Sequence, residues 1–262
     1  MSESELTKAL APSGALYLMM NRPEVNNAID DRQIQRLIDT FESAAQNDDV
    51  KVVVLGGCDK NFCAGGDINY MRRVGSNSYE DNLADARSMA RLFRTINEFP
   101  KPTIARVQGA AMGGGVGLVC CCDIAVGTPK ARFALSEIKI GMLPATIAPY
   151  VVRSIGEKPA RRFFITGEMV NAERALQVGF LSELVEADAL DKRIEEIAGM
   201  LIANAPSGFE KAKWLINEVY GKNIDEELIE TTVRLIADLR DSDEGREGLS
   251  AFLEKRKPNW LA

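Results

Sequence analysis

A group of four glycines that follows a short apolar segment constrains this chain more than any other feature of its sequence. The segment ends at Val107, and the glycines come within the next ten residues, at Gly113, Gly114, Gly115 and Gly117. A second apolar segment, 116–122, begins among them. Glycines in front of a helix leave backbone N–H groups unobstructed, where they can bind an anion or a developing oxyanion. The stretch therefore predicts a strand, a glycine turn and a helix, with space for a ligand at the turn.

A lone carboxylate, Glu137, follows about twenty residues after this cluster. Its neighbours Leu135, Ile138 and Ile140 are apolar, which argues against a solvated surface position. Apolar surroundings disfavour the charged form of a carboxyl group, and the resulting rise of its pKa suits proton transfer near neutral pH. Unobstructed N–H donors and one acid/base carboxylate together make a minimal site for enolate chemistry.

The composition excludes several other classes of site. The 262 residues include no histidine, and the formal net charge is -6. Without histidine, no Ser-His-Asp or Cys-His catalytic pair can form within the chain. No G-x-x-x-x-G-K-[ST] loop occurs, and the glycines around Gly113 do not fit G-x-G-x-x-G, so the usual signatures of nucleotide hydrolysis and dinucleotide redox are missing. The net negative charge disfavours a nucleic-acid surface.

Three adjacent cysteines, 120–122, are expected to be small core residues. Successive residues on a helix point about 100° apart and cannot all face one ion, and no histidine is present to complete a zinc site. Cysteine is also among the most buried residue types. We therefore expect no metal. No apolar run reaches the length of about 18 residues that a membrane span needs, and the acidic start has no secretory pattern, so we expect a cytoplasmic protein without a membrane partner.

The hydropathy pattern predicts an α/β fold that ends in helices. Strands are expected at 15–21, 51–56, 103–107, 123–126 and 181–185, and 61–71 is expected as a loop. A helix is expected to begin after Asp30 or Asp31, a natural N-cap, with its apolar stripe between Ile34 and Ala45, and further helices are expected at 79–97, 160–166, 172–178, 189–203, 209–220, 226–239 and 246–255. Alternating strands and helices followed by a helical tail indicate α/β with an α-helical C-terminal module.

Several longer motifs occur in a characteristic order over nearly the whole chain. They are N-R-P-E-V-N-N-A-I (21–29), F-C-A-G-G-D-I (62–68), K-P-T-I-A-R-V-Q-G-A-A-M-G-G-G (101–115), C-D-I-A (122–125), F-A-L-S-E-I-K-I-G-M-L-P (133–144) and F-L-E-K-R-K-P-N-W (252–260). In these motifs the chain resembles the crotonase (enoyl-CoA hydratase/isomerase) superfamily. The order of the motifs makes this resemblance far more specific than any one of them alone.

The resemblance implies a crotonase-type spiral of ββα repeats with a C-terminal α-helical oligomerisation module. Residues 1–200 would form the spiral core with the CoA and active site, and 201–262 the helical trimerisation region. A homotrimer or a hexamer, as a dimer of trimers, is implied. The substrate would be an acyl-CoA thioester, and no further cofactor would be needed. Apolar residues from Phe209 onward exceed what a thin helical tail can bury alone, which fits assembly with neighbouring subunits.

The resemblance also assigns the site. Gly66 and Gly114 would hold the thioester carbonyl with their backbone N–H groups, and Glu137 would be the catalytic carboxylate. The residues implied to bind the substrate and CoA are Ala64, Gly66, Asp67, Ile68, Asn69 and Gly114. The residues alone leave Gly66 and Gly114 equally open to a plain turn role, whereas oxyanion donors in a dry site stabilise charge strongly.

Two departures from the hydratase pattern affect the mechanism. The first of the two carboxylates usual in family hydratases falls on Gly117, and the usual G-G-T-Q after Pro144 becomes A-T-I-A-P-Y. A single glutamate is typical of family isomerases. The string from Gly113 to Val151 nevertheless looks like the bacterial 3-methylglutaconyl-CoA hydratase branch, which implies leucine or isoprenoid catabolism. We place hydration of a 2-enoyl-CoA first, Δ3-Δ2-enoyl-CoA isomerisation second, and an RNA-binding role last.

The sequence does not fix the acyl group or the residue that would hold the attacking water. A dicarboxylic acyl group would need a cation at the distal end of the pocket, and three side chains are candidates: Arg72, Arg73 and Lys139.

Overall fold

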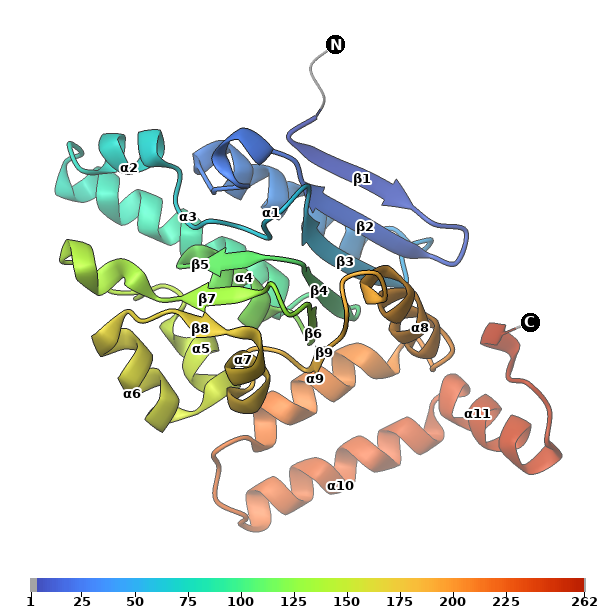
Figure 1. Ribbon diagram of the computed structural model, residues 1–262. Helices are drawn as coiled ribbons and strands as arrows, with labels where there is room; N and C mark the ends of the chain where they lie inside the picture. Colours follow the sequence, from blue (N-terminus) through green and yellow to red (C-terminus); the bar gives the residue numbers. More distant parts are fainter. Residues whose placement is uncertain (1–3, 262) are drawn as a thin grey trace. The chain divides into compact units, whose positions relative to one another are not determined.

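A six-stranded sheet, in the order β1-β2-β3-β4-β6-β9, lies at the centre of the N-terminal part of the chain (Figure 1). The structure is a computed structural model and describes residues 4–261. Its internal contacts divide the chain into two units, Met1–Ala198 and Gly199–Ala262. The strands are β1 (Leu6–Leu10), β2 (Ala15–Met20), β3 (Val52–Gly57), β4 (Thr103–Val107), β6 (Ile124–Gly127) and β9 (Glu183–Leu184).

The sheet is parallel from β2 to β9 because its strands are buried and joined by helices. All six residues of β3 are buried, which explains its unbroken β-branched sequence. Val53 of β3 pairs with Leu16 on one side and with Thr103 on the other. Only β1 is antiparallel, pairing Leu6 with Met20. The sequence analysis missed β1 because, of its five residues, only Leu6 is buried.

Two long helices in contact with each other flank this sheet. Helix α1 (Asp31–Ala45) begins at the N-cap Asp30, whose side chain accepts a hydrogen bond from Gln33 N, and it buries the apolar stripe that contains Phe41. Helix α3 (Tyr79–Asn97) begins at Ser78 in the same manner. Phe41 meets Phe99, which follows α3, edge to face with ring centroids 5.2 Å apart.

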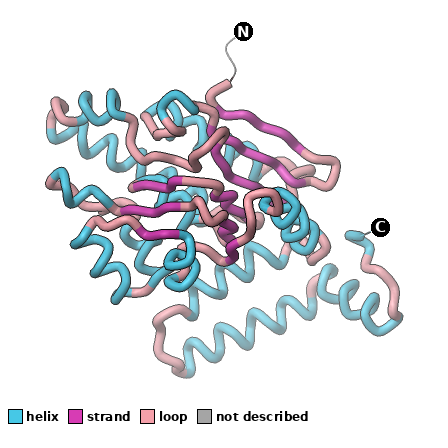
Figure 2. The backbone as a smooth tube through the Cα atoms, viewed as in Figure 1, coloured by secondary structure: helices cyan, strands magenta, loops and turns pink. Residues whose placement is uncertain are grey.

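A second, three-stranded sheet, in the order β5-β7-β8, stands beside the first (Figure 2). Its strands are β5 (Ala110–Met112), β7 (Arg132–Ala134) and β8 (Val170–Asn171). The sequence analysis missed all three because strands of two or three residues are too short to show a period. Strand β5 directly precedes the glycine cluster, and η2 (Ser136–Ile140), a 3-10 helix, follows β7 and contains Glu137. This small sheet therefore brings the two motifs together.

Two further segments differ from expectation for local reasons. The end of the expected loop 61–71 is the start of helix α2 (Ile68–Val74), because Asp67 caps it by accepting hydrogen bonds from Asn69 N and Tyr70 N. Helix α5 (Ala148–Ile155) was not expected, since it contains Pro149. Proline is well tolerated in the first turn, where its missing N–H has no helical partner in any case.

The remaining helices match the expected positions within a few residues. They are α4 (Gly114–Cys121), α6 (Glu157–Thr166), α7 (Ala172–Val178), α8 (Leu190–Ile202), α9 (Gly208–Val219), α10 (Glu226–Asp241) and α11 (Asp243–Glu254), with short 3-10 turns at η1 (Pro23–Val25) and η3 (Asn259–Leu261). The expected fold class, α/β with a helical C-terminal module, is confirmed. Within residues 4–261, no helix combines the length and apolar character needed to cross a membrane.

Candidate active site

The loop that contains Gly66 is attached to the chain segment before α1 by a single parallel bridge. Ile29 donates its N–H to Gly65 O at 2.7 Å and accepts a hydrogen bond from Asp67 N at 2.8 Å. The two hydrogen bonds of this bridge are made by Gly65 and Asp67, the residues immediately before and after Gly66. Within residues 4–261 the N–H of Gly66 itself has no backbone acceptor. The backbone therefore holds this group in place and leaves it unpaired.

A second bridge ties the same loop to β5. Cys63 donates its N–H to Ala110 O and accepts a hydrogen bond from Met112 N, both at 2.9 Å. Gly65 has φ +93°, and a methyl group added to it would lie 3.1 Å from Met112 O. Only glycine allows the two backbones to approach so closely in this conformation. The Gly66 loop and the glycine cluster are therefore one rigid assembly.

Helix α4 begins within the glycine cluster. Gly113, with φ +48°, is its N-cap and donates its N–H to Ala134 O at 2.9 Å. Gly114 is the first helical residue, and the first N–H groups of a helix have no partner within it. The N–H of Gly114 has no backbone acceptor in the described part of the chain. Two unpaired donors, from Gly66 and Gly114, are thus supplied by two loops that the bridges join.

Glu137 lies against the turn that begins α4. A methyl group added to Gly113 would stand 2.9 Å from Glu137 Oε1, so the carboxylate occupies the space that a side chain at this position would take. Its other oxygen, Oε2, is buried without a hydrogen-bond partner among residues 4–261. Burial raises the pKa of Glu137 above its ordinary value, and its own backbone N–H only partly opposes this. A partly desolvated carboxylate beside N–H donors can exchange protons with a bound substrate.

The apolar neighbours expected around Glu137 are not what buries it. Ile138 and Ile140 are 38% and 59% exposed, and only Leu135 is buried. Ile138 follows Glu137 directly in the 3-10 helix η2 and so points in another direction, and Ile140, one turn further on, lies at the exposed end of that helix. Its desolvation comes in part from the packing of its carboxylate on the turn at Gly113.

The chain is similar to known enzymes over almost its full length. The family model for enoyl-CoA hydratase/isomerase matches residues 11–262. The chain belongs to the enoyl-CoA hydratase/isomerase family. It is 30% identical to the 2,3-dehydroadipyl-CoA hydratase of Escherichia coli, over 94% of this chain and 94% of that one. It is also 30% identical to the crotonyl-CoA hydratase of Syntrophomonas wolfei, again over 94% of each chain.

Solved structures of the family have the same fold. A crystal structure of an enoyl-CoA hydratase from Shewanella pealeana superposes with a TM-score of 0.95 at 39% identity, covering 99% of this chain and 97% of that one. The crotonase-type architecture expected from the motifs is thereby confirmed. The chain is an enzyme of the enoyl-CoA hydratase type, and an acyl-CoA thioester is the substrate class of its family.

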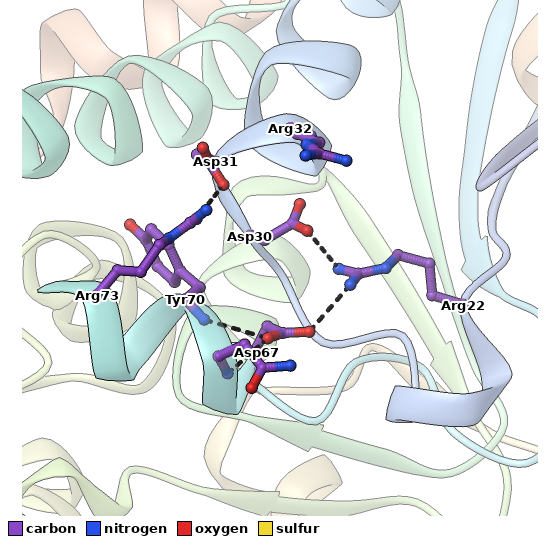
Figure 3. Close-up of a pocket in the computed structure, with 8 residues that line it drawn as sticks. Arg22, Asp30, Asp31, Arg32, Asp67, Tyr70 and Arg73 are labelled. Atoms are coloured by element: carbon purple, nitrogen blue, oxygen red, sulfur yellow. Dashed lines mark hydrogen bonds and ion pairs between the residues drawn. The ribbon is translucent and has the colours of Figure 1, made fainter.

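In this enoyl-CoA hydratase-type enzyme, a buried arginine connects the segments on both sides of the Gly66 bridge. Arg22 donates from Nη1 to Ala28 O at 2.9 Å and pairs with Asp30 at 3.1 Å. Its Nη2 pairs with Asp67 Oδ2 at 2.9 Å. Figure 3 shows this guanidinium between the two carboxylates. The side chains of Arg22 and Asp67 are 12% and 5% exposed, so little solvent screens the pair.

Asp67 combines two structural tasks in this network. Burial tends to raise the pKa of its carboxyl group, but hydrogen bonds from Tyr70 N and Asn69 N and the Arg22 charge lower it below the ordinary value. The ionised carboxylate thus caps α2 and anchors Arg22. The sequence analysis assigned Asp67 to CoA binding and assigned no role to Arg22. The N-R-P motif could have pointed to it, since a buried arginine needs paired carboxylates.

A cavity of about 280 Å³ lies beside this network, and three arginines and three aspartates are among its lining residues, as Figure 3 shows. Arg22 is paired with Asp30 and Asp67, and Arg73 pairs with Asp31 at 2.6 Å. The charges of the lining therefore balance, and most of them are already engaged within the protein. The cavity does not form a strong anion site by itself.

The other residues predicted to bind substrate or CoA lie in the loop after Cys63 and in the first turn of α2. Ala64 donates its N–H to Asn26 O, Ile68 is 68% exposed at the start of α2, and Asn69 accepts a hydrogen bond from Arg72. A methyl group added to Gly66 would lie 3.3 Å from Met71 Cγ, so Met71, which was not singled out from the sequence, packs beside the Cα of Gly66. Its position on α2 at i+4 from Asp67 is the signal that could have indicated it.

The three candidate cations for a distal carboxylate differ in availability. Arg73 is engaged by Asp31 and stacks over the Tyr70 ring at 5.9 Å. Arg72 is exposed, and its guanidinium donates a 3.3 Å hydrogen bond to Asn69 Oδ1. Lys139 is exposed, and its Cε would lie 3.1 Å from a methyl group added to Gly167. None of the three has a contact that orients it toward Glu137.

The cysteines are placed as packing residues. Burial raises the pKa of the Cys63 thiol and of the Cys120 thiol to about 12, and that of Cys121 is raised as well. Thiols in this state are poor ligands and nucleophiles at neutral pH. Among residues 4–261, no group of three or more Cys, Asp and Glu side chains is arranged to hold a metal ion.

We expect Glu137→Gln to lose turnover while keeping substrate affinity. The substitution keeps the shape of the side chain and removes the proton carrier, which is worth ~10²–10⁴-fold or more in rate. The N–H donors are unchanged, so acyl-CoA binding measured by calorimetry should persist. Glu157→Gln, at a side chain that is 78% exposed, is the matched control and should keep full activity. In the unchanged enzyme, kcat/KM should fall as pH decreases through the raised pKa of Glu137.

The same variant should have the opposite effect on stability. Because the folded-state pKa of Glu137 is raised, the ionised carboxylate destabilises the native state at neutral pH. Gln cannot ionise, so Glu137→Gln should melt at a higher temperature than the parent near pH 7.5. The two should converge at a pH below the ordinary glutamate value of 4.5. Equal melting temperatures across this range would contradict the desolvation of Glu137.

We expect Arg22→Ala to destabilise the enzyme because it leaves Asp30 and Asp67 facing each other without a cation. Removing one partner of a buried pair typically lowers the free energy of unfolding by ~3–5 kcal/mol. The exposed pair of Arg91 and Glu42, at 56% and 50% side-chain exposure, is the matched control. Arg91→Ala should cost less than ~1 kcal/mol in urea titrations. An Arg22→Ala variant no less stable than Arg91→Ala would show that the ion pairs of Arg22 with Asp30 and Asp67 do not stabilise the fold.

Proposed function

We propose that this enzyme reversibly hydrates a 2-enoyl-CoA to a 3-hydroxyacyl-CoA, with 3-methylglutaconyl-CoA or a similar branched acyl group as substrate, in leucine or isoprenoid catabolism. The observation that carries the proposal is the partly buried carboxylate of Glu137, whose Oε2 has no hydrogen-bond partner among residues 4–261, beside the turn that presents the Gly114 N–H. The motif pattern around Gly113 and Glu137 supports the choice of acyl group.

The geometry supports the following reaction. The N–H groups of Gly66 and Gly114 donate hydrogen bonds to the thioester oxygen and withdraw electrons from the double bond. Glu137 takes a proton from water, whose oxygen forms a bond to C3, and the electron pair of the double bond moves toward the thioester oxygen. The resulting enolate is stabilised by the two donors. Glu137 then returns the proton to C2, which regenerates the carboxylate. No metal or redox cofactor takes part in these steps.

The CoA moiety is proposed to lie along the loop 64–69 at the start of α2. Ala64, Gly66, Ile68 and Asn69 offer backbone and exposed side-chain contacts there, while the Asp67 carboxylate is turned into the Arg22 network. Of the two candidate arginines, Arg72 is the less engaged, since Arg73 is held by Asp31, and Arg72 lies on the same helix α2 that begins at this loop. We propose Arg72 as the partner of a distal carboxylate.

Isomerisation is the second candidate, because Gly117 stands where a second carboxylate would be. A single base is sufficient to move a proton between C4 and C2 of an enoyl-CoA. The relatives also differ in acyl group, since one is a hydratase of 2,3-dehydroadipyl-CoA and another of crotonyl-CoA.

Incubation with a panel of thioesters in deuterated water tests both candidates. The panel contains 3-methylglutaconyl-CoA, 2,3-dehydroadipyl-CoA, crotonyl-CoA and a 3-enoyl-CoA, and mass spectrometry reads the products. We expect 3-hydroxyacyl products with deuterium at C2 and the highest kcat/KM for 3-methylglutaconyl-CoA. An Arg72→Ala variant should raise KM for the two dicarboxylic thioesters and leave crotonyl-CoA unaffected. If the enzyme converts the 3-enoyl-CoA and none of the 2-enoyl-CoA thioesters, its reaction is isomerisation and the proposed hydration is wrong.

We also propose that the enzyme assembles as a homotrimer or a dimer of trimers through its C-terminal helices. Within the unit Gly199–Ala262, apolar side chains are exposed on α9 and α10, including Ile216 at 62% and Val233 at 51%. Exposed apolar surface of this density marks an interface. Light scattering should give a mass of three or six chains. Ile216→Asp should lower that mass, whereas Glu210→Ala on the same helix should not. A monomer at micromolar concentration would contradict the assembly.

A further inference from the structure

Gly117 lies inside helix α4, where glycine is unfavourable. A glycine in a helix interior is less stable than alanine by roughly 0.5–1 kcal/mol because its backbone loses more freedom on folding. The φ angle of Gly117 is not in the left-handed region, so the backbone does not require glycine here. A close neighbour must therefore explain it.

That neighbour is the side chain of Ile147. A methyl group added to Gly117 would lie 2.2 Å from Ile147 Cγ2, 3.0 Å from its Cβ and 2.8 Å from Phe93 Cε1. Real carbon atoms do not approach to 2.2 Å, and neither neighbour can move away easily. Ile147 is 2% exposed and Phe93 is fully buried in the core. Gly117 is thus a site of close packing between α4 and the N-cap of α5.

The filled space borders the proposed reaction site. Gly117 lies four residues, or about 6 Å along the helix axis, beyond Gly113. Gly113 is the residue against which the Glu137 carboxylate packs, and Gly114 supplies one of the two N–H donors. A carboxylate at position 117 would therefore extend from the same helix as the oxyanion donor, about one turn beyond the Glu137 contact. Ile147 belongs to the segment 145–150, the second place where the sequence departs from the hydratase pattern.

We propose that Ile147 is the residue that limits this enzyme to one catalytic carboxylate. Its side chain takes the volume that a glutamate at position 117, and a water held by that glutamate, would need. The two places where the sequence departs from the hydratase pattern, 117 and 145–150, therefore pack against each other in the folded chain. This inference rests on the proposed function, since it assigns both proton transfers to Glu137.

A double-mutant cycle on stability tests the packing. Gly117→Ala should lower the melting temperature by on the order of 5 °C, because overpacking cannot be relieved. In an Ile147→Gly background the same substitution should cost clearly less, because glycine is acceptable at a helix N-cap and of the two clashes only the milder one, 2.8 Å from Phe93 Cε1, remains. Gly199→Ala in α8, where an added methyl group would meet nothing within 4 Å, is the control and should be neutral or stabilising. Equal losses in both backgrounds would overturn the proposal.

The chemical consequence is tested with Gly117→Glu in both backgrounds, using crotonyl-CoA. Combined with Ile147→Gly, the new carboxylate should fold into place and add a second ionisation to the pH profile of kcat/KM. With Ile147 present, Gly117→Glu should be destabilised and add none. The proposal is overturned if Gly117→Glu alone is as stable as the parent and shows the second ionisation, or if the folded double variant shows none. If the parent hydrates no 2-enoyl-CoA, the proposed function fails, while the stability cycle still reports on Ile147.

Discussion

The arrangement of this site depends on two backbone bridges that leave two particular N–H groups unpaired. Ile29 bonds the residues on both sides of Gly66, and Cys63 bonds both sides of Ala111, so the loop and the glycine turn form one assembly. An unpaired N–H costs free energy to the extent that it is withdrawn from water. Gly114 at the start of α4 is partly buried, whereas Gly66 is exposed, and Arg22 fixes the loop after Gly66 through its ion pair with Asp67. Preorganised donors of this kind need no rearrangement when charge develops on a substrate.

Glu137 adds a second destabilising element at the same place. Its carboxylate is desolvated against the turn at Gly113, and one oxygen has no partner among the described residues. This desolvation lowers the stability of the native state at neutral pH. It also raises the pKa of Glu137, which suits the proposed role of this carboxylate as a base. The close packing of Ile147 on Gly117 then restricts the chemistry to this one carboxylate. Site reactivity and local instability therefore have the same physical cause.

The sequence predicted the long, strongly periodic elements well. Helix α3 and strand β4 lie at the expected residues, and α1 begins after an expected cap, Asp30. It did not predict β5, β7 and β8, which are too short to show a pattern, or α5, which contains Pro149. The glycine donors and Glu137 could be proposed from motif and chemistry alone. The partners that position them could not, because Arg22 with Asp67 and Ile147 with Gly117 meet only in the folded chain.

The proposed chemistry depends most on the N–H groups of Gly66 and Gly114 polarising a bound thioester. Infrared difference spectroscopy of a ¹³C-carbonyl-labelled 2-enoyl-CoA bound to the Glu137→Gln variant measures this directly, since the variant keeps both donors and does not turn over. The account predicts that the carbonyl stretch moves to lower frequency than in free solution, because two hydrogen bonds weaken the C=O bond. A bound thioester whose carbonyl frequency equals or exceeds that of the free thioester in water would contradict it.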